Sequence, residues 1–306
     1  MYRNLLLLLT LLFVLFGAAL PSGAEEQQVL SKLYPGITPG ILSFSTLGTL
    51  PDGILLQSAG VEVKTEELAA ELAKQPATSK AEMEHNQLYL LEKTVTPRLL
   101  PAVTQSQGGT SQALPLPTSN AAAAYPDSIT ADLKVTDKEV AAFYKENKEM
   151  CGGAPLRKVK SQLRDYLLEQ KKQAAIKEHA RTLGQRTPIV IASNWAKEQA
   201  ALALNNPVDQ ARRSGLPALV DFGSTGCRSC AMMAPILEEL KTKYAGKANV
   251  LFIHVQEQPV LAERYGITTI PVQVFFDKDG REVYRNNGVM SREQIETKFA
   301  ELGVAS

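Results

Sequence analysis

The sequence has few of the residues that build metal centres, disulfide scaffolds or strongly charged surfaces. Its 306 residues include only three cysteines, three histidines and one tryptophan, and the formal net charge is +1. A nearly neutral chain gives no reason to expect binding to nucleic acid. Three cysteines are too few for a disulfide scaffold in a chain this long, so cysteine chemistry is favoured over stapling. The length itself predicts two folded units.

The first 24 residues have the pattern of a secretory signal peptide. Arg3 precedes a mostly apolar run from Leu5 to Leu20, and Ser22-Gly23-Ala24 supplies the small residues of a cleavage site. We expect cleavage after Ala24 and a periplasmic location for the mature chain. The alternative is an uncleaved membrane anchor, for which the apolar run is short. The cysteines of an exported protein lie in an oxidising compartment, in which disulfides form and are exchanged.

Changes in composition divide the rest of the chain. Residues 25–49 are rich in Gly, Pro, Ser and Thr and are interpreted as an irregular lead-in. Residues 50–192 carry amphipathic helical patterns, interrupted by a low-complexity loop at 103–126. A connector at 193–206 leads to 207–306, where strands and helices alternate. The sequence therefore predicts a mainly α N-terminal domain with a few short strands, followed by an α/β domain.

Helix signals dominate residues 50–192. In order, we expect a strand pair at 53–63, a helix capped by Thr65, a helix from Lys80 to about Leu100 limited by Pro97, a helix with a Thr136–Glu139 capping box, a helix at 155–183 and a strand at 188–191.

This order of elements resembles the N-terminal chaperone domain of SurA-type periplasmic folding factors. The resemblance rests on residues 54–68, 135–148, the long basic helix and 187–191. It implies that the closing strand pairs with the opening one and that the helices form a cradle for unfolded chains. No parvulin isomerase module fits between Asn147 and the long helix, so proline isomerisation is not implied. An unrelated helical spacer is the alternative.

Two cysteines, Cys227 and Cys230, stand where a strand is expected to pass into a helix. They follow the apolar run at 216–222 and precede apolar residues at helical spacing in 231–240. A helix N-terminus favours a thiolate, which makes Cys227 the nucleophile and Cys230 the resolving thiol. The same spacing is half of a zinc site, but a second cysteine pair is absent and the histidines are few. We therefore expect redox chemistry without a metal or another cofactor. The histidines are His85, His179 and His254.

Four separated features beyond residue 207 agree with one another. They are Asp221-Phe222 in a strand, the cysteine pair, Pro235 five residues after it, and the segment from Tyr265 to Pro271 before another strand. Through them, residues 207–303 resemble exported members of the thioredoxin superfamily. The resemblance implies a thioredoxin-like fold in which Cys227 attacks and Cys230 resolves.

The resemblance also assigns roles to residues around the cysteines. Asp221 corresponds to the buried carboxylate that shuttles the proton of Cys230, since an acid in a buried strand needs an explanation. Pro271 corresponds to the cis-proline of the fold, and the backbone of Ile270 before it would pair with a bound peptide. An ordinary proline at a strand start is the alternative for Pro271.

Some positions depart from the family pattern. Gly226 replaces the tryptophan that is usual in the family, and Arg228-Ser229 replaces Gly-Pro. In the family these positions contact the substrate and tune the reduction potential. The resemblance therefore does not predict the substrate or the reduction potential of this protein. Arg228 beside the nucleophile would lower its pKa, whereas a solvated side chain is the alternative. His254 is expected to be a strand-face residue, and Cys151 a small buried hydrophobe rather than a regulatory thiol.

The pattern as a whole predicts an exported thiol–disulfide oxidoreductase. Its substrates would be unfolded or disulfide-bearing exported proteins, held by the N-terminal domain, and the resemblance implies a membrane thiol transporter as electron donor. The alternative is a periplasmic chaperone or binding protein that uses the thioredoxin-like domain as a docking module.

Overall fold

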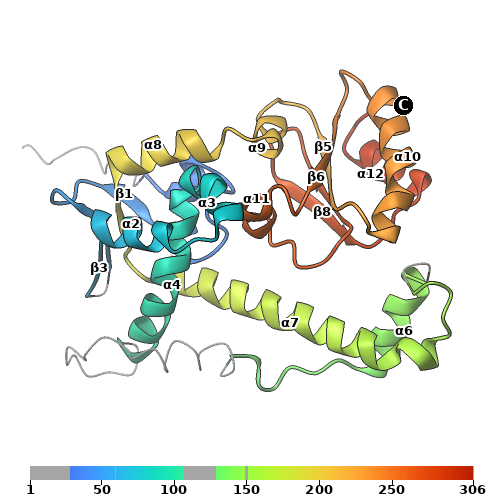
Figure 1. Cartoon of the computed structure of the whole chain (residues 1–306), viewed down its shortest axis with the longest axis horizontal. Coiled ribbons are helices and arrows are strands. Elements are labelled where there is room, and N and C mark those ends of the chain that lie inside the picture. Colours follow the sequence, from blue (N-terminus) through green and yellow to red (C-terminus); the bar gives the residue numbers. More distant parts are fainter. Residues whose placement is uncertain (1–27, 59, 107–128, 149–150, 306) are drawn as a thin grey trace, which may run out of the picture.

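The computed structural model describes residues 28–58, 60–106, 129–148 and 151–305 (Figure 1). The predicted signal peptide, 1–24, lies outside these ranges, as do residues 107–126 of the low-complexity loop predicted at 103–126. The start of that loop was placed wrongly, because residues 103–106 are the last turn of the helix α4 (Gln87–Ser106). None of the helices in the described ranges combines the length and apolar character that crossing a membrane requires.

The N-terminal part contains a four-stranded sheet with the strand order β1-β4-β2-β3. Its strands are β1 (Thr46–Gly48), β2 (Ile54–Ser58), β3 (Val61–Lys64) and β4 (Val190–Ala192). The last strand lies between the first two, parallel to β1 and antiparallel to β2, with Leu56 opposite Ile191. Both of these side chains are fully buried. The closing strand therefore pairs with an opening strand, which is the pairing implied by the resemblance stated above.

Three helices pack against this sheet, α2 (Thr65–Ala73), α4 (Gln87–Ser106) and α8 (Ser193–Ala203), and α3 (Ala77–Glu84) packs against α2 and α4. Three expectations were wrong here. Thr65 is the first helical residue rather than the cap, which is Lys64. The helix expected from Lys80 is divided at Asn86, whose side chain amide donates to Glu82 O at 2.7 Å. Pro97 does not end α4. Burial of the apolar face of the helix stabilises it by more than the loss of the hydrogen bond that proline cannot donate.

The segment predicted as an irregular lead-in belongs to the core. It forms α1 (Leu30–Leu33), the 3-10 helix η1 (Ile41–Phe44) and β1, and its apolar side chains Leu30, Ile41 and Leu42 are fully buried. The carboxylate of Glu92 accepts hydrogen bonds from the backbone N–H groups of Gly40 and Leu42, both at 3.0 Å. Burial raises the pKa of Glu92 to about 7. Scattered leucines in a Gly- and Pro-rich stretch were sufficient to fold it against the helices.

Helices α6 (Asp137–Glu146) and α7 (Leu156–Arg186) form an arm that extends beneath the C-terminal part (Figure 1). The predicted capping box of Thr136 and Glu139 starts α6. The C-terminal end of α7 packs closely against the 3-10 helix η1 at Gly184, where a Cβ atom would lie 2.4 Å from the carbonyl oxygen of Ile41. Most of the arm therefore lies away from the core that anchors it.

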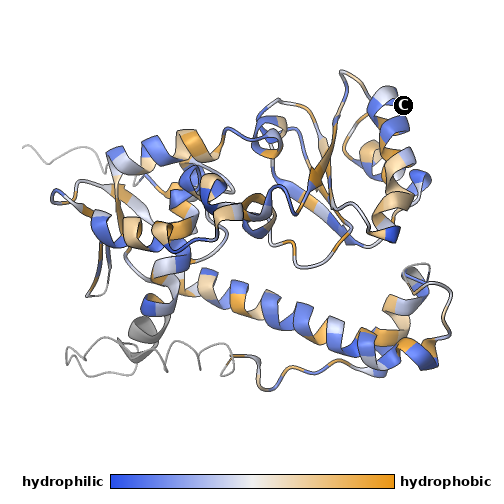
Figure 2. Ribbon diagram, viewed as in Figure 1, coloured by the Kyte–Doolittle hydropathy of each residue, from blue (hydrophilic) through white to orange (hydrophobic). Residues whose placement is uncertain are grey.

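The C-terminal part contains a second four-stranded sheet with the order β6-β5-β7-β8. Its strands are β5 (Ala218–Gly223), β6 (Asn249–His254), β7 (Val272–Phe276) and β8 (Glu282–Asn287). β5 is parallel to β6 and antiparallel to β7, and β8 is antiparallel to β7. The strand ribbons at the centre of this sheet are hydrophobic, as Figure 2 shows.

Helices cover both faces of this second sheet. Leu219 and Phe275 pack under α10 (Arg228–Lys243) and α12 (Arg292–Glu301), whereas Val220 and Phe222 pack under α9 (Pro207–Arg212) and α11 (Pro259–Arg264). This alternation of strands and helices, closed by a hairpin and a helix, is the predicted thioredoxin-like α/β fold.

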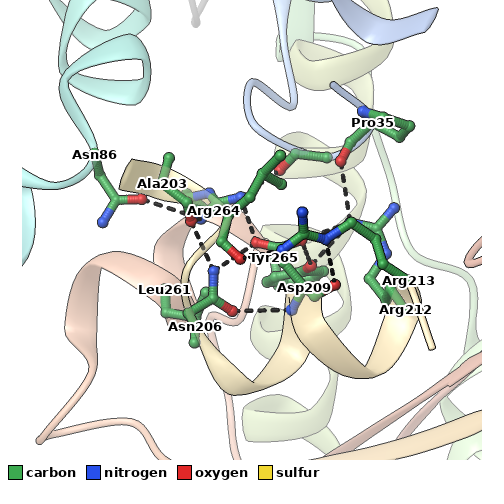
Figure 3. A network of polar contacts seen from close by, with 12 residues as sticks. Pro35, Asn86, Ala203, Asn206, Asp209, Arg212, Arg213, Leu261, Arg264 and Tyr265 are labelled. Atoms are coloured by element: carbon green, nitrogen blue, oxygen red, sulfur yellow. Dashed lines mark hydrogen bonds and ion pairs between the residues drawn. The ribbon is translucent and has the colours of Figure 1, made fainter. Parts of the chain in front are cut away.

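A buried polar network joins the two parts of the chain (Figure 3). The guanidinium of Arg264, at the end of α11, lies 2.9 Å from Asp209 Oδ2 and donates to Asn86 Oδ1 and to the carbonyl of Gly36, both at 3.0 Å. Its side chain is fully buried, and both terminal guanidinium nitrogens are hydrogen-bonded, whereas Nε has no partner among the described residues. Because α11 leads into residues 266–271, the N-terminal part holds that segment in place.

Candidate active site

The two cysteines lie where β5 passes into α10 and are joined by a disulfide, with their Cα atoms 5.2 Å apart. Cys227 is the N-cap residue of α10, and its sulfur accepts a hydrogen bond from the backbone N–H of Cys230 at 3.1 Å. Cys227 is partly exposed, whereas Cys230 is only 4% exposed. An incoming sulfur can therefore reach Cys227, while Cys230 is shielded by the fold.

The loop before Cys227 is held by a histidine. The backbone N–H of Thr225 donates to His254 Nε2 at 3.0 Å, and the Thr225 hydroxyl lies 2.8 Å from the same nitrogen. Gly226 has φ +82°, a conformation that favours glycine and explains its presence at this position. Arg228, the first residue of α10, is exposed. His254, expected only as a strand-face residue, fixes the loop that carries the nucleophile.

The segment before β7 contains the second set of predicted site residues. The Ile270–Pro271 peptide bond is cis, and the carbonyl of Pro271 accepts from the backbone N–H of Gly288 at 2.9 Å. Pro271 is buried and Ile270 is partly exposed. The hydroxyl of Thr269 lies 3.2 Å from the hydroxyl of Tyr166, which belongs to α7. The arm thus touches the residue next to Ile270.

A polar row crosses the sheet on the face covered by α10. Asp221 on β5 lies opposite Gln273 on β7, which lies opposite Asn286 on β8. Gln273 Nε2 donates to Asp221 Oδ1 at 2.6 Å, and Asn286 Nδ2 donates to Gln273 Oε1 at 2.7 Å. Asp221 and Gln273 are fully buried. Burial raises the pKa of Asp221 to about 6, and the hydrogen bond from Gln273 opposes this rise.

A hollow of about 360 Å³ opens between β6 and the first turns of α10. Its lining includes Cys230, Thr225 and the ring of Phe252, whose residue is 49% exposed. Gly223 makes this arrangement possible, since a Cβ atom there would lie 2.8 Å from the Phe252 ring and 3.2 Å from Cys230 Sγ. The resolving sulfur is thus next to an open, mostly apolar hollow.

Sequence reasoning found the cysteines and Asp221 but missed the residues that hold them. The signal for Gln273 was present, because an amide within the apolar strand Val272–Phe276 needs a buried partner. Cys151, expected to be buried, is a partly exposed free cysteine between α6 and α7, so that expectation was wrong. Within the described ranges, no three His, Cys, Asp or Glu side chains cluster as metal ligands would.

Comparison with known proteins places this site in a family. A family model described as Thioredoxin matches residues 201–301. A thioredoxin of Alicyclobacillus acidocaldarius is 39% identical over 93 residues, which are 30% of this chain and 88% of that relative. A thioredoxin of Staphylococcus aureus is 43% identical over 77 residues, 25% of this chain and 73% of the relative.

Among solved structures, thioredoxin NaTrxh from Nicotiana alata is 26% identical, covers 31% of this chain and 79% of its own, and has a TM-score of 0.28. The sequence relatives decide the assignment, because this chain spans most of their length. Through its C-terminal part, the chain belongs to the thioredoxin family.

Proposed function

We propose that the protein is an exported thiol–disulfide oxidoreductase that exchanges disulfides with protein substrates. The observation that carries this proposal is the Cys227–Cys230 disulfide at the start of α10, with the sulfur of Cys227 accessible and accepting a backbone N–H. In the reduced protein the same N–H and the helix N-terminus would stabilise a Cys227 thiolate. Export is supported by the signal-peptide pattern at 1–24.

The exchange follows from this geometry. The Cys227 thiolate attacks one sulfur of a substrate disulfide, a mixed disulfide forms, and the other substrate sulfur leaves with the electron pair. Cys230 then loses its proton and attacks Cys227, which restores the intramolecular disulfide and releases the reduced substrate. Asp221 is the proposed acceptor of that proton. Gly226, Arg228, Ile270 and Pro271 are proposed to contact the substrate backbone.

The arm supports a role of the N-terminal part in holding substrates. Apolar side chains along α7 are only partly buried, and one of them, Tyr166, reaches Thr269 beside Ile270. A chain held on this helix would lie near the disulfide, and such tethering raises its effective concentration there. The side chains are Val159, Leu163, Tyr166, Leu167 and Ile176. Unfolded or disulfide-bearing exported proteins are the proposed substrates, and a membrane thiol transporter the proposed electron source.

Turnover of insulin disulfides by the full-length protein, with dithiothreitol as reductant, tests the enzymatic part. We expect catalysed insulin precipitation that is lost in Cys227→Ser and Cys230→Ser. The alternative function is that of a chaperone or binding protein with a docking domain. It predicts no catalysis by the unmodified protein and equal suppression of aggregation of a reduced, unfolded test protein by all three forms.

A further inference from the structure

The polar row beside the disulfide has a defined place and direction. Asp221 and Gly223 alternate on one strand and so share a face, and a Cβ atom on Gly223 would lie 3.2 Å from Cys230 Sγ. The carboxyl of Asp221 therefore lies on the face of the sheet that carries Cys230. Gln273 and Asn286 continue the same cross-strand row toward the edge strand β8.

The orientation of the Gln273 amide is set by its second neighbour. Asn286 Nδ2 donates to Gln273 Oε1 and also to the carbonyl of Gly288, at 2.7 and 3.1 Å. With its oxygen occupied in this way, Gln273 must direct its NH₂ group toward Asp221. A flipped amide would set its oxygen against a carboxylate oxygen, which is unfavourable without a proton between them. Asn286 thus determines that Gln273 acts as a donor.

The remaining surroundings of Asp221 leave one oxygen without a partner. Oδ2 is buried and has no hydrogen-bond partner within the described part of the chain. On the other side of the row, β6 places Phe252 beside Asp221. The neighbours of Asp221 on this face are Phe252, Gln273 and Cys230, and among the described residues burial and the hydrogen bond from Gln273 are what shift its pKa. Gln273 is therefore the side chain that selects which carboxyl oxygen stays free.

We propose that Gln273, oriented by Asn286, is a positioning residue for disulfide exchange: it holds Oδ1 of Asp221 so that Oδ2 remains to receive the proton of Cys230. This inference rests on the proposed function. In the resolving step the S–H bond of Cys230 breaks, its proton goes to Oδ2, and its electron pair forms the bond to Cys227 Sγ. The disulfide bond between Cys227 and the substrate breaks, and the substrate sulfur leaves as a thiolate with the electron pair of that broken bond. The proton on Asp221 then passes to water.

Replacement of Gln273 by leucine removes the donor and keeps a side chain of similar size. Since the donor stabilises the carboxylate, its loss raises the pKa of Asp221 and moves the acid limb of the resolving step to higher pH. A hydrogen bond to a charged group predicts a shift of about one pH unit, or a roughly tenfold slower step near pH 5. Asn286→Ala should shift the limb in the same direction by less. Asn287→Ala, on the other face of β8, should not shift it.

The resolving step can be measured by stopped flow with 5,5′-dithiobis(2-nitrobenzoate) on reduced full-length protein that carries Cys151→Ser. Attack by Cys227 releases one thionitrobenzoate at a rate that depends on reagent concentration. Attack by Cys230 then releases the second thionitrobenzoate at a rate that is independent of the reagent concentration. The rate of the second release is recorded between pH 4.5 and 9 for each variant.

We expect Q273L to shift the acid limb of the second release when Asp221 is present and to have no such effect in an Asp221→Asn background. The inference is overturned if Q273L leaves the profile unchanged, or if it causes the same shift without Asp221. Absence of any second release from the protein with native Asp221 and Gln273 would instead reject the proposed oxidoreductase function, so the two failures are distinguishable.

Discussion

The buried carboxyl of Asp221 should destabilise the protein at neutral pH, and its removal should stabilise it. Burial raises the pKa of Asp221 from its ordinary 3.8 to about 6, a difference of about two units. Each unit corresponds to ~1.4 kcal/mol, so ionisation of the folded protein costs about 3 kcal/mol. Asp221→Asn keeps the oxygen that accepts from Gln273, but the NH₂ group of the new asparagine has no partner. This unpaired group reduces the gain in stability by about 1 kcal/mol. We expect a net gain of about 2 kcal/mol at pH 8.

The sign of the pH dependence is fixed by the direction of the shift. A group whose pKa is higher in the folded state stabilises fully below its unfolded pKa, and that contribution is lost as the pH rises through the folded pKa. Asp221→Asn should therefore be less stable than the unmodified protein by about 1 kcal/mol at pH 3.5, gain stability between pH 4 and 6, and be more stable by about 2 kcal/mol above pH 7. Glu92, whose pKa is also raised, is present in both proteins and cancels in the difference.

Urea unfolding of both oxidised full-length proteins, followed by circular dichroism at 222 nm at pH 3.5, 5, 6 and 8, measures this difference. A difference in stability that is equal at all four pH values would contradict this prediction, because it could not come from ionisation of the carboxyl. A loss of stability at pH 8 would refute it as well.

Three further predictions concern the rest of the molecule. Arg264→Met removes one of the two guanidinium groups that pair with buried Asp209, the other being that of Arg212, and should lower the unfolding free energy by about 3 kcal/mol by calorimetry, whereas Arg292→Ala, at an exposed pair, should change it little. Gly226→Ala imposes φ +82° on a residue with a Cβ atom but meets no neighbour within 4 Å; a cost of about 1–2 kcal/mol in urea unfolding is expected, and a larger one would indicate a contact absent from this structure. Tyr166→Phe removes the hydroxyl that contacts the hydroxyl of Thr269. Amide hydrogen exchange should therefore become faster in the middle of α7 and stay unchanged near Gly184. If the variant and the unmodified protein exchange at the same rates along all of α7, the contact does not hold the arm.

Periodicity and spacing predicted most of the C-terminal fold, because its strands are short apolar runs and its helices begin at recognisable signals. The capping box of Thr136 and the closing strand at 190–192 were predictable for the same reason. The break at Asn86 was not, because it depends on a buried arginine 178 residues further along the chain. Local pattern carries no information on such distant partners.

The candidate site shows the same division. Cys227 and Cys230 could be named from their spacing at an expected helix start, and Asp221 from the resemblance to the thioredoxin superfamily and its place as an acid in an apolar strand. The roles of His254 and Gln273 depend on strand register, which sets His254 against Thr225 and Gln273 against Asp221. Register follows from the packing of the whole sheet, so a single sequence offered only the hint of polar residues within apolar strands.

Trapping of a mixed disulfide shows whether Cys227 is the attacking thiol of a disulfide exchange. Full-length protein carrying Cys230→Ser and Cys151→Ser is incubated with an unfolded peptide that contains one disulfide, and the products are examined by mass spectrometry. We expect a mixed disulfide between Cys227 and the peptide that dithiothreitol releases and that does not form in Cys227→Ser. No adduct at Cys227, with that thiol shown to be reduced, would contradict it.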